Sequence, residues 1–197
     1  MVLNKADVLL LHSNEISAAG CAVFADMIAC PTCASMQSLG QLHLTDNQLG
    51  DMGLKFIATA IQNAPATVLP GLRELHIGRC SIGDKGTIKL AAALAVSGLP
   101  RLQILSLAQN SVGDDGCVAL AEAFRDGYPR PNLKGVYLGR NAIGDTGATA
   151  LVSMLSKRGC LIGLMQIHLF ANKLTPEGAQ ALEGAAKSRK DLAIDLE

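Results

Sequence analysis

Leu102-Gln-Ile-Leu-Ser-Leu-Ala-Gln-Asn-Ser-Val-Gly-Asp-Asp-Gly116 is the stretch of sequence that decides the fold. It follows the pattern Leu-x-x-Leu-x-Leu-x-x-Asn, and the segment Gly-Asp-x-Gly comes shortly after. Five further copies begin at Ala6, Leu39, Leu72, Leu133 and Leu164, and a last fragment begins at Leu192. The ninth position holds Asn14, Asn47, Cys80, Asn110, Asn141 and Asn172, which are 33, 33, 30, 31 and 31 residues apart. A period of this length indicates a solenoid, in which each repeat packs against its neighbours.

The pattern resembles the leucine-rich repeat, in its ribonuclease-inhibitor-like subclass. The residues that carry the resemblance are the strand signature with Asn or Cys at its ninth position and the Gly-Asp-x-Gly segment. The resemblance covers essentially the whole chain, from Ala6 to Leu196. It implies an α/β solenoid shaped as a horseshoe arc, with a parallel β-sheet on the concave face and α-helices on the convex face. Six repeats plus a terminal strand predict seven strands and six helices, in a single domain over residues 1–197.

Within each repeat, the period-two alternation of a strand sends the fourth and sixth positions into the core and the third, fifth and seventh to the opposite face. We expect the amide of the ninth residue to satisfy backbone groups that the following turn leaves unpaired. Helical periodicity comes next, with an aspartate in the first turn, where negative charge suits the helix dipole. These aspartates are Asp51, Asp84, Asp114 and Asp145. Thr175 and Pro176 fit the N-cap and first position of the last helix, and Ser17 is the equivalent cap of the first.

Composition restricts the classes of partner. Lys plus Arg equals Asp plus Glu, 17 against 17, so charge gives no case for nucleic acid or an anionic membrane. No stretch approaches a membrane span and no signal peptide is convincing, which favours a cytoplasmic protein, or a nuclear one. The six cysteines do not form a disulfide framework, so we expect reduced thiols. Cys30-Pro-Thr-Cys33 is predicted in a loop after a helix, where a redox role is disfavoured.

The side chains on the concave face are the candidate site. The fifth position of successive strands gives Leu10, His43, His76, Ser106, Tyr137, His168 and Asp195. Aromatic residues and arginines dominate interface hot spots, so we expect a protein partner to contact a set of residues on this face. This set is Tyr137, Arg140, His168, Phe170, Ile104, His76, Arg79 and His43.

His43 and His76 occupy equal places on neighbouring strands, about 4.8 Å apart, and two imidazoles at that spacing can share a metal ion. Zinc usually takes at least three protein ligands, and no third strong ligand is in line. We therefore expect no metal. Nor does the sequence contain a nucleophile–base signature or a phosphate-binding glycine loop, so no cofactor and no enzymatic activity are expected.

The leading functional hypothesis is a non-catalytic protein–protein interaction scaffold that holds a partner on the concave strand face. The alternative is a regulator of a small GTPase, because the repeat type is similar to that of Ran GTPase-activating protein. Arg79 or Arg140 would then act on the nucleotide site of the partner. Because solenoid ends generally need covering, end-to-end self-association is a further expectation.

Overall fold

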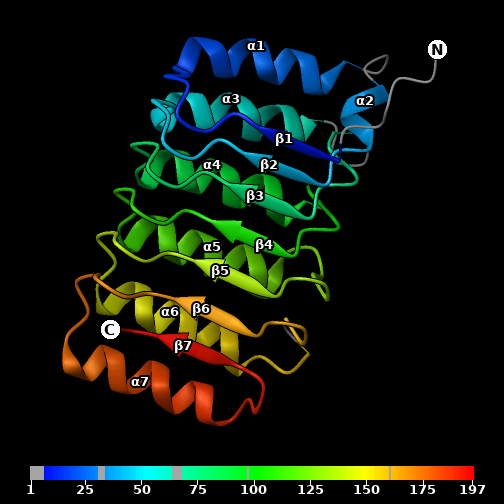
Figure 1. Ribbon diagram of the computed structural model, residues 1–197. Coiled ribbons are helices and arrows are strands. Elements are labelled where there is room, and N and C mark those ends of the chain that lie inside the picture. The colour runs from blue at the N-terminus through cyan, green and yellow to red at the C-terminus, as the bar shows by residue number, and fades with distance from the viewer. Residues whose placement is uncertain (1–6, 31–33, 64–67, 97, 160) are drawn as a thin grey trace.

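The computed structural model describes the chain except residues 1–6, 31–33, 64–67, 97 and 160. Seven parallel strands form one sheet, in the order in which they occur in the sequence. They are β1 (Val8–Leu10), β2 (Gln41–His43), β3 (Glu74–His76), β4 (Ile104–Ser106), β5 (Gly135–Tyr137), β6 (Gln166–His168) and β7 (Ala193–Asp195). Figure 1 shows the strands stacked side by side from the N-terminal to the C-terminal end.

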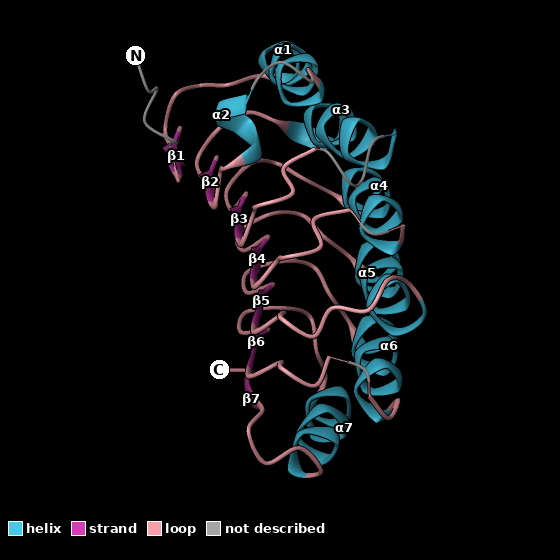
Figure 2. Cartoon of the chain, turned by 90° about the vertical axis from the view of Figure 1, so that its right-hand side faces the viewer, coloured by secondary structure: helices cyan, strands magenta, loops and turns pink. Residues whose placement is uncertain are grey.

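Six helices lie on the other side of the molecule and form its convex face (Figure 2). They are α1 (Ala18–Ala29), α3 (Gly50–Asn63), α4 (Asp84–Ala95), α5 (Asp114–Asp126), α6 (Asp145–Ser156) and α7 (Pro176–Lys187). The solenoid prediction is therefore confirmed. A short helix that the sequence did not predict, α2 (Ala34–Gln37), follows α1 and uses part of the extra length of the first repeat.

The core lies between the sheet and the helices and runs the length of the solenoid. The strand residues predicted to point inward are buried from β2 to β6. Apolar residues at helical spacing, including Ile57, Leu90, Leu120 and Leu151, are buried opposite them. In β1, the first strand in the order of the sheet, the corresponding Leu9 is only half-buried. Small alanines such as Ala93 are fully buried and let the helices approach the sheet. The predicted inward face is thus confirmed from β2 to β6.

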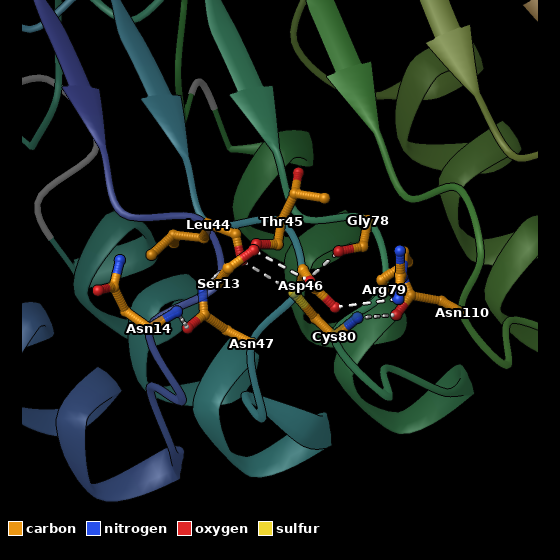
Figure 3. A network of polar contacts seen from close by, with 10 residues as sticks. All are labelled: Ser13, Asn14, Leu44, Thr45, Asp46, Asn47, Gly78, Arg79, Cys80 and Asn110. Atoms are coloured by element: carbon orange, nitrogen blue, oxygen red, sulfur yellow. Dashed lines mark hydrogen bonds and ion pairs between the residues drawn. The ribbon is translucent and has the colours of Figure 1, made fainter.

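The ninth-position asparagines join neighbouring repeats. The Asn110 Oδ1 atom accepts hydrogen bonds from the backbone N–H groups of Cys80 and Ile82, at 2.9 and 3.0 Å. Its Nδ2 atom donates to the carbonyls of Ile77 and Leu107, both at 2.9 Å. Figure 3 shows the bond between Asn110 and Cys80 and the corresponding bond between Asn47 and Asn14 in the preceding repeats. The predicted backbone role is confirmed, and the structure adds that three of these four Asn110 bonds cross to the preceding repeat.

Cys80 takes the asparagine place in the third repeat with different chemistry. Its Sγ atom lies 3.1 Å from the carbonyl oxygen of Leu44 and 3.2 Å from that of Gly78, so the thiol replaces the amide as donor. A thiol offers no equivalent of the amide carbonyl as acceptor. Burial raises the pKa of this thiol, which keeps the proton that it donates.

Arg130 lies three residues before the first leucine of its repeat, a place where three other repeats have a buried leucine. Leu69 and Leu99 stand at the equivalent place, and both are buried. The Arg130 side chain is buried too, and its guanidinium donates to the backbone carbonyls of Leu94, Gly98 and Leu99. Desolvation lowers the pKa of this guanidinium to about 10, so the group is still charged at neutral pH. Sequence periodicity alone did not indicate this buried cation.

Candidate functional site

The fifth-position side chains form a row across the concave face. The strand register pairs Leu10 with His43, His43 with His76, His76 with Ser106, and so on through Tyr137, His168 and Asp195. This row was predicted from the repeat pattern, and the register confirms it. Most of its members are half-buried, since the neighbouring side chains on the same face cover part of each.

A hollow of about 310 Å³ lies in the middle of this face, over β3 to β6. Its lining consists of His76, Ser106, Ala108, Tyr137, Gly139, His168 and Phe170. Two of the lining residues, Ala108 and Gly139, are small residues at the seventh position of their repeats. A Cβ atom on Gly139 would lie 2.5 Å from a ring carbon of Phe170, so this glycine lets the aromatic ring lie close against the neighbouring repeat.

We call Tyr137, Arg140, His168 and Phe170 the aromatic patch. The rings of Tyr137 and His168 lie with their centroids 4.6 Å apart and tilted by 35°. The Arg140 guanidinium carbon lies 5.8 Å from the centroid of the Phe170 ring, which is within the range of a cation–π contact. The structure therefore brings four of the eight predicted site residues into one cluster on β5 and β6 and the turns that follow them.

Polar neighbours hold the aromatic patch in place. The Tyr137 hydroxyl donates to Gln166 Oε1 at 2.9 Å, and His168 Nδ1 lies 3.1 Å from Asp195 Oδ2. The Tyr137 ring lies over Gly135, whose missing side chain leaves room for it. Sequence reasoning had placed Gln166 and Asp195 on the concave face without assigning them a role. The signal was available for Asp195, whose fifth position pairs in register with that of His168. The Tyr137 hydroxyl instead reaches Gln166 diagonally, from the fifth position of one strand to the third position of the next.

A second cluster lies on β2 and β3. The imidazoles of His43 and His76 stack with centroids 4.3 Å apart and an angle of 7° between the rings. His76 Nε2 lies 3.2 Å from Glu74 Oε2, and Gln41 Nε2 donates to Glu74 Oε1 at 3.2 Å. The expectation that no third metal-binding group is in line is wrong, because Glu74 projects from the same face two residues before His76. One donor atom from each of His43, Glu74 and His76 lies within 4.8 Å of the others.

The two remaining predicted residues lie at the edges of these clusters. Arg79 stands at the end of β3, and its guanidinium forms an ion pair with Asp46 at 3.3 Å (Figure 3). The Arg79 side chain is 60% exposed, so a partner can still reach it. Ile104, on β4, pairs in register with Glu74 on one side and Gly135 on the other. It is half-buried between the two clusters.

Arg79 and Arg140 share a backbone geometry that points them away from the sheet. Both residues follow a strand at the eighth position and have positive φ angles, 51° and 56°. The same left-handed conformation recurs at Ser13, Asp46, Gln109 and Ala171. The eighth position therefore has the same backbone conformation at the end of each of the first six strands, and we call Arg79 and Arg140 the rim arginines.

The fifth-position row contains a serine, a histidine and an aspartate, but their order does not make a hydrolytic triad. Ser106 lies on β4 and His168 on β6, with Tyr137 between them. Two strand spacings separate the serine and histidine backbones by about 9.6 Å, whereas nucleophile and base need a hydrogen bond. The row supplies hydrogen-bond and stacking groups rather than an activated nucleophile.

Cys21 and Cys117 are buried cysteines that are poorly suited to react as thiolates. Burial raises the pKa of the Cys117 thiol to about 12 and that of Cys21 to about 11. Cys30 follows the C-terminal end of α1, as predicted, while Cys33 lies outside the described residues.

Across the described chain, no helix has the length and apolar character required to cross a bilayer. The cytoplasmic location stays a prediction.

Known proteins with this repeat decide the family. A family model described as "Leucine Rich repeat" matches residues 35–58, 70–91, 99–121 and 131–152. Mouse (Mus musculus) ribonuclease inhibitor is 29% identical over 92 residues, which are 47% of this chain and 18% of the relative. The chain is a leucine-rich repeat protein. Its repeats, each with a strand and a full helix, are similar to those of ribonuclease inhibitor, as the sequence pattern predicted.

Solved structures with the same architecture include two of similar size. The C-terminal domain of tropomodulin from Caenorhabditis elegans superposes with a TM-score of 0.62, at 10% identity, over 88% of this leucine-rich repeat chain and 93% of that one. Actin-binding site 2 of leiomodin-1 superposes with a TM-score of 0.61, also at 10% identity, over 87% and 89%. At this identity the likeness is one of fold.

Proposed function

We propose that this leucine-rich repeat protein is a non-catalytic scaffold that binds a protein partner on its concave strand face. The observation that carries the proposal is the hollow over β3 to β6 with the aromatic patch beside it. A concave pocket flanked by Tyr, Phe and Arg suits the anchoring side chain of a partner. Position-seven glycine and alanine are part of its lining, and the rim arginines add charge.

The energetics favour these residues as the main contributors to affinity. Tyr137 and Phe170 are held by neighbouring side chains before any partner arrives, through Gln166, His168, Gly139 and Arg140. Binding of a partner therefore costs little free energy for fixing the conformations of these two side chains. Truncating a hot-spot residue typically costs about 2 kcal/mol or more, roughly a thirtyfold loss of affinity.

Similar proteins suggest defined probes for the partner. The chain matches less than a fifth of the length of mouse ribonuclease inhibitor, so the activity in that protein's name does not transfer as such. Leiomodin-1 is described as having an actin-binding site in its matching region, and there the likeness is of fold alone. Purified ribonuclease and actin are the first two candidate partners to test.

A site-specific crosslinking experiment tests the proposal. The photoreactive residue p-benzoylphenylalanine replaces Tyr137 on the concave face in one variant and the exposed Lys89 on helix α4 in a second. We expect irradiation in cell extract, or with either purified probe, to crosslink a partner to the concave variant only. Tyr137→Ala with Phe170→Ala should abolish capture of the same partner and leave the melting temperature within a few degrees. Crosslinks from the convex variant, with capture intact in the double mutant, would refute the concave site.

The alternative function, regulation of a small GTPase, stays a second prediction. Arg140 is exposed and contacts the face of Phe170, so it is reachable by a partner's nucleotide site. Single-turnover GTP hydrolysis with candidate GTPases measures this directly. A rate increase that Arg79→Ala or Arg140→Ala removes would favour regulation over simple binding.

A further inference from the structure

His43, Glu74 and His76 have the donor set and spacing of a transition-metal site. The three side chains come from neighbouring strands in register, so the sheet itself fixes the positions of their Cα atoms. All three are half-buried on the concave face, and one donor atom from each lies within 4.8 Å of the others. Around a tetrahedral zinc ion with bonds of about 2.0–2.1 Å, neighbouring ligand atoms lie roughly 3.3 Å apart. The Glu74–His76 separation of 3.2 Å already matches this value.

The imidazole rings are not yet oriented for a shared ion. A metal ion lies in the plane of each imidazole that binds it, and the planes of His43 and His76 are nearly parallel at 7°. One ion cannot lie in both planes, so at least one ring has to turn about its Cβ–Cγ bond. Both rings are only half-buried and lie on an open face, which leaves room for that rotation.

A further neighbour fixes the third ligand. Gln41 donates from Nε2 to Glu74 Oε1 at 3.2 Å, which leaves the other carboxylate oxygen, Oε2, directed at His76. Outer contacts of this kind orient ligating carboxylates and raise metal affinity. Two imidazoles and one carboxylate suit zinc, and with three protein ligands a fourth tetrahedral position is left for water.

We propose that His43, Glu74 and His76 bind a divalent zinc ion on the concave face, with Gln41 positioning the carboxylate. The ion's open position faces the surface on which we expect the partner. The zinc site shares His76 with the lining of the hollow but uses none of the aromatic patch, so zinc titration tests it separately from partner capture. It also reverses the expectation drawn from the sequence, since the missing third ligand is Glu74.

Zinc affinity should fall in acid, because only a neutral imidazole can bind the metal. The loss of affinity is expected as the pH falls through the ordinary imidazole range, at about pH 6.5.

Isothermal titration calorimetry of the full chain with zinc chloride tests the proposal. The protein is first freed of metal with a chelator and kept reduced with a phosphine, so that the thiols stay in one state. We expect the wild-type chain to bind one equivalent of zinc. The affinity for zinc should fall at least about tenfold in each of the variants His43→Ala, His76→Ala and Glu74→Gln. His168→Ala is the matched control, because it removes an imidazole from the same position of another strand.

Imidazole NMR signals separate this site from binding by the thiols. With zinc, the side-chain signals of His43 and His76 should shift, while those of His12 and His168 stay in place. Circular dichroism of each variant shows that it is folded. Zinc uptake that persists unchanged in His43→Ala/His76→Ala, or an absence of uptake by the folded wild-type chain, would overturn the proposal.

Discussion

Asp84 accepts a hydrogen bond from the backbone N–H of Gly113 at 2.7 Å, across the boundary between two repeats. The same Oδ1 atom accepts a second bond from Gly116 N–H at 2.9 Å. Sequence reasoning assigned Asp84 to the dipole of its own helix, α4, and it does lie in the first turn. Its hydrogen bonds, however, cap the next helix, α5, whose N-cap residue is Gly113 and has no side chain to do so.

This relationship repeats and explains the Gly-Asp-x-Gly segment. Asp51 and Asp114 make the corresponding pairs of bonds, each at 2.7 and 2.9 Å. A Cβ atom at Gly116 would lie 2.7 Å from Asp84 Oδ1, so glycine is needed where the carboxylate of the preceding repeat approaches. The conserved spacing within the chain thus encodes contacts between repeats rather than within one.

Asp84→Ala is expected to lower the free energy of unfolding by about 1.5–3 kcal/mol, because two N–H groups at the start of α5 lose a charged acceptor. Urea denaturation measures the change. Asp115→Ala is the control, since Asp115 lies in the first turn of α5 and is exposed. Equal losses in the two variants would show that the helix dipole, and not the bond between repeats, is responsible.

The Asp145 carboxyl group should make the free energy of unfolding depend on pH. Hydrogen bonds from the Thr175 hydroxyl and backbone N–H lower its pKa below the ordinary value. A lowered carboxyl pKa contributes stability above the unfolded value of about 3.9, and that stability is lost as the pH falls through the folded value. The difference in stability between wild type and Asp145→Asn should therefore be largest near neutral pH and shrink below about pH 4. A difference that stays constant down to pH 2 would contradict this.

Asn110→Ala is expected to destabilise the chain by about 1–3 kcal/mol, because backbone groups of two repeats lose their partner. Those groups include the Cys80 N–H and the Ile77 carbonyl. The urea midpoint measures the loss. Replacement of the neighbouring exposed Gln109 by alanine should change it little. An unchanged midpoint in Asn110→Ala would contradict the linking role.

The buried thiols should resist alkylation in the folded protein. The thiolate is the reactive form, and with pKa values of about 12 for Cys117 and about 11 for Cys21 it is scarce at pH 8. Brief iodoacetamide treatment followed by mass spectrometry should find both unmodified, and treatment in denaturant should modify all six cysteines. Rapid modification of Cys117 in the native chain would show that the helices α5 and α6 open readily.

The sequence by itself determined the architecture, because the same pattern of leucines followed by asparagine or cysteine occurs six times. The leucine spacing gives the inward face of every strand, and the ninth residue marks every turn. The fifth-position row from Leu10 to Asp195 also followed from counting, since parallel strands of identical repeats must align in register. In such a fold, the position of a residue within its repeat also determines which residues of the neighbouring strands lie beside it.

Tertiary structure decided which side chains meet across the row. Glu74 lies close to both His43 and His76, and the Phe170 ring lies over Gly139. Each of these side chains has several possible neighbours on the open face, and its rotamer determines which of them it contacts. Arg130 likewise donates hydrogen bonds to three backbone carbonyls, at a position where three other repeats have a buried leucine. Backbone register follows from periodicity, whereas side-chain partners depend on the space and charge that adjacent repeats supply, and these differ from one repeat to the next.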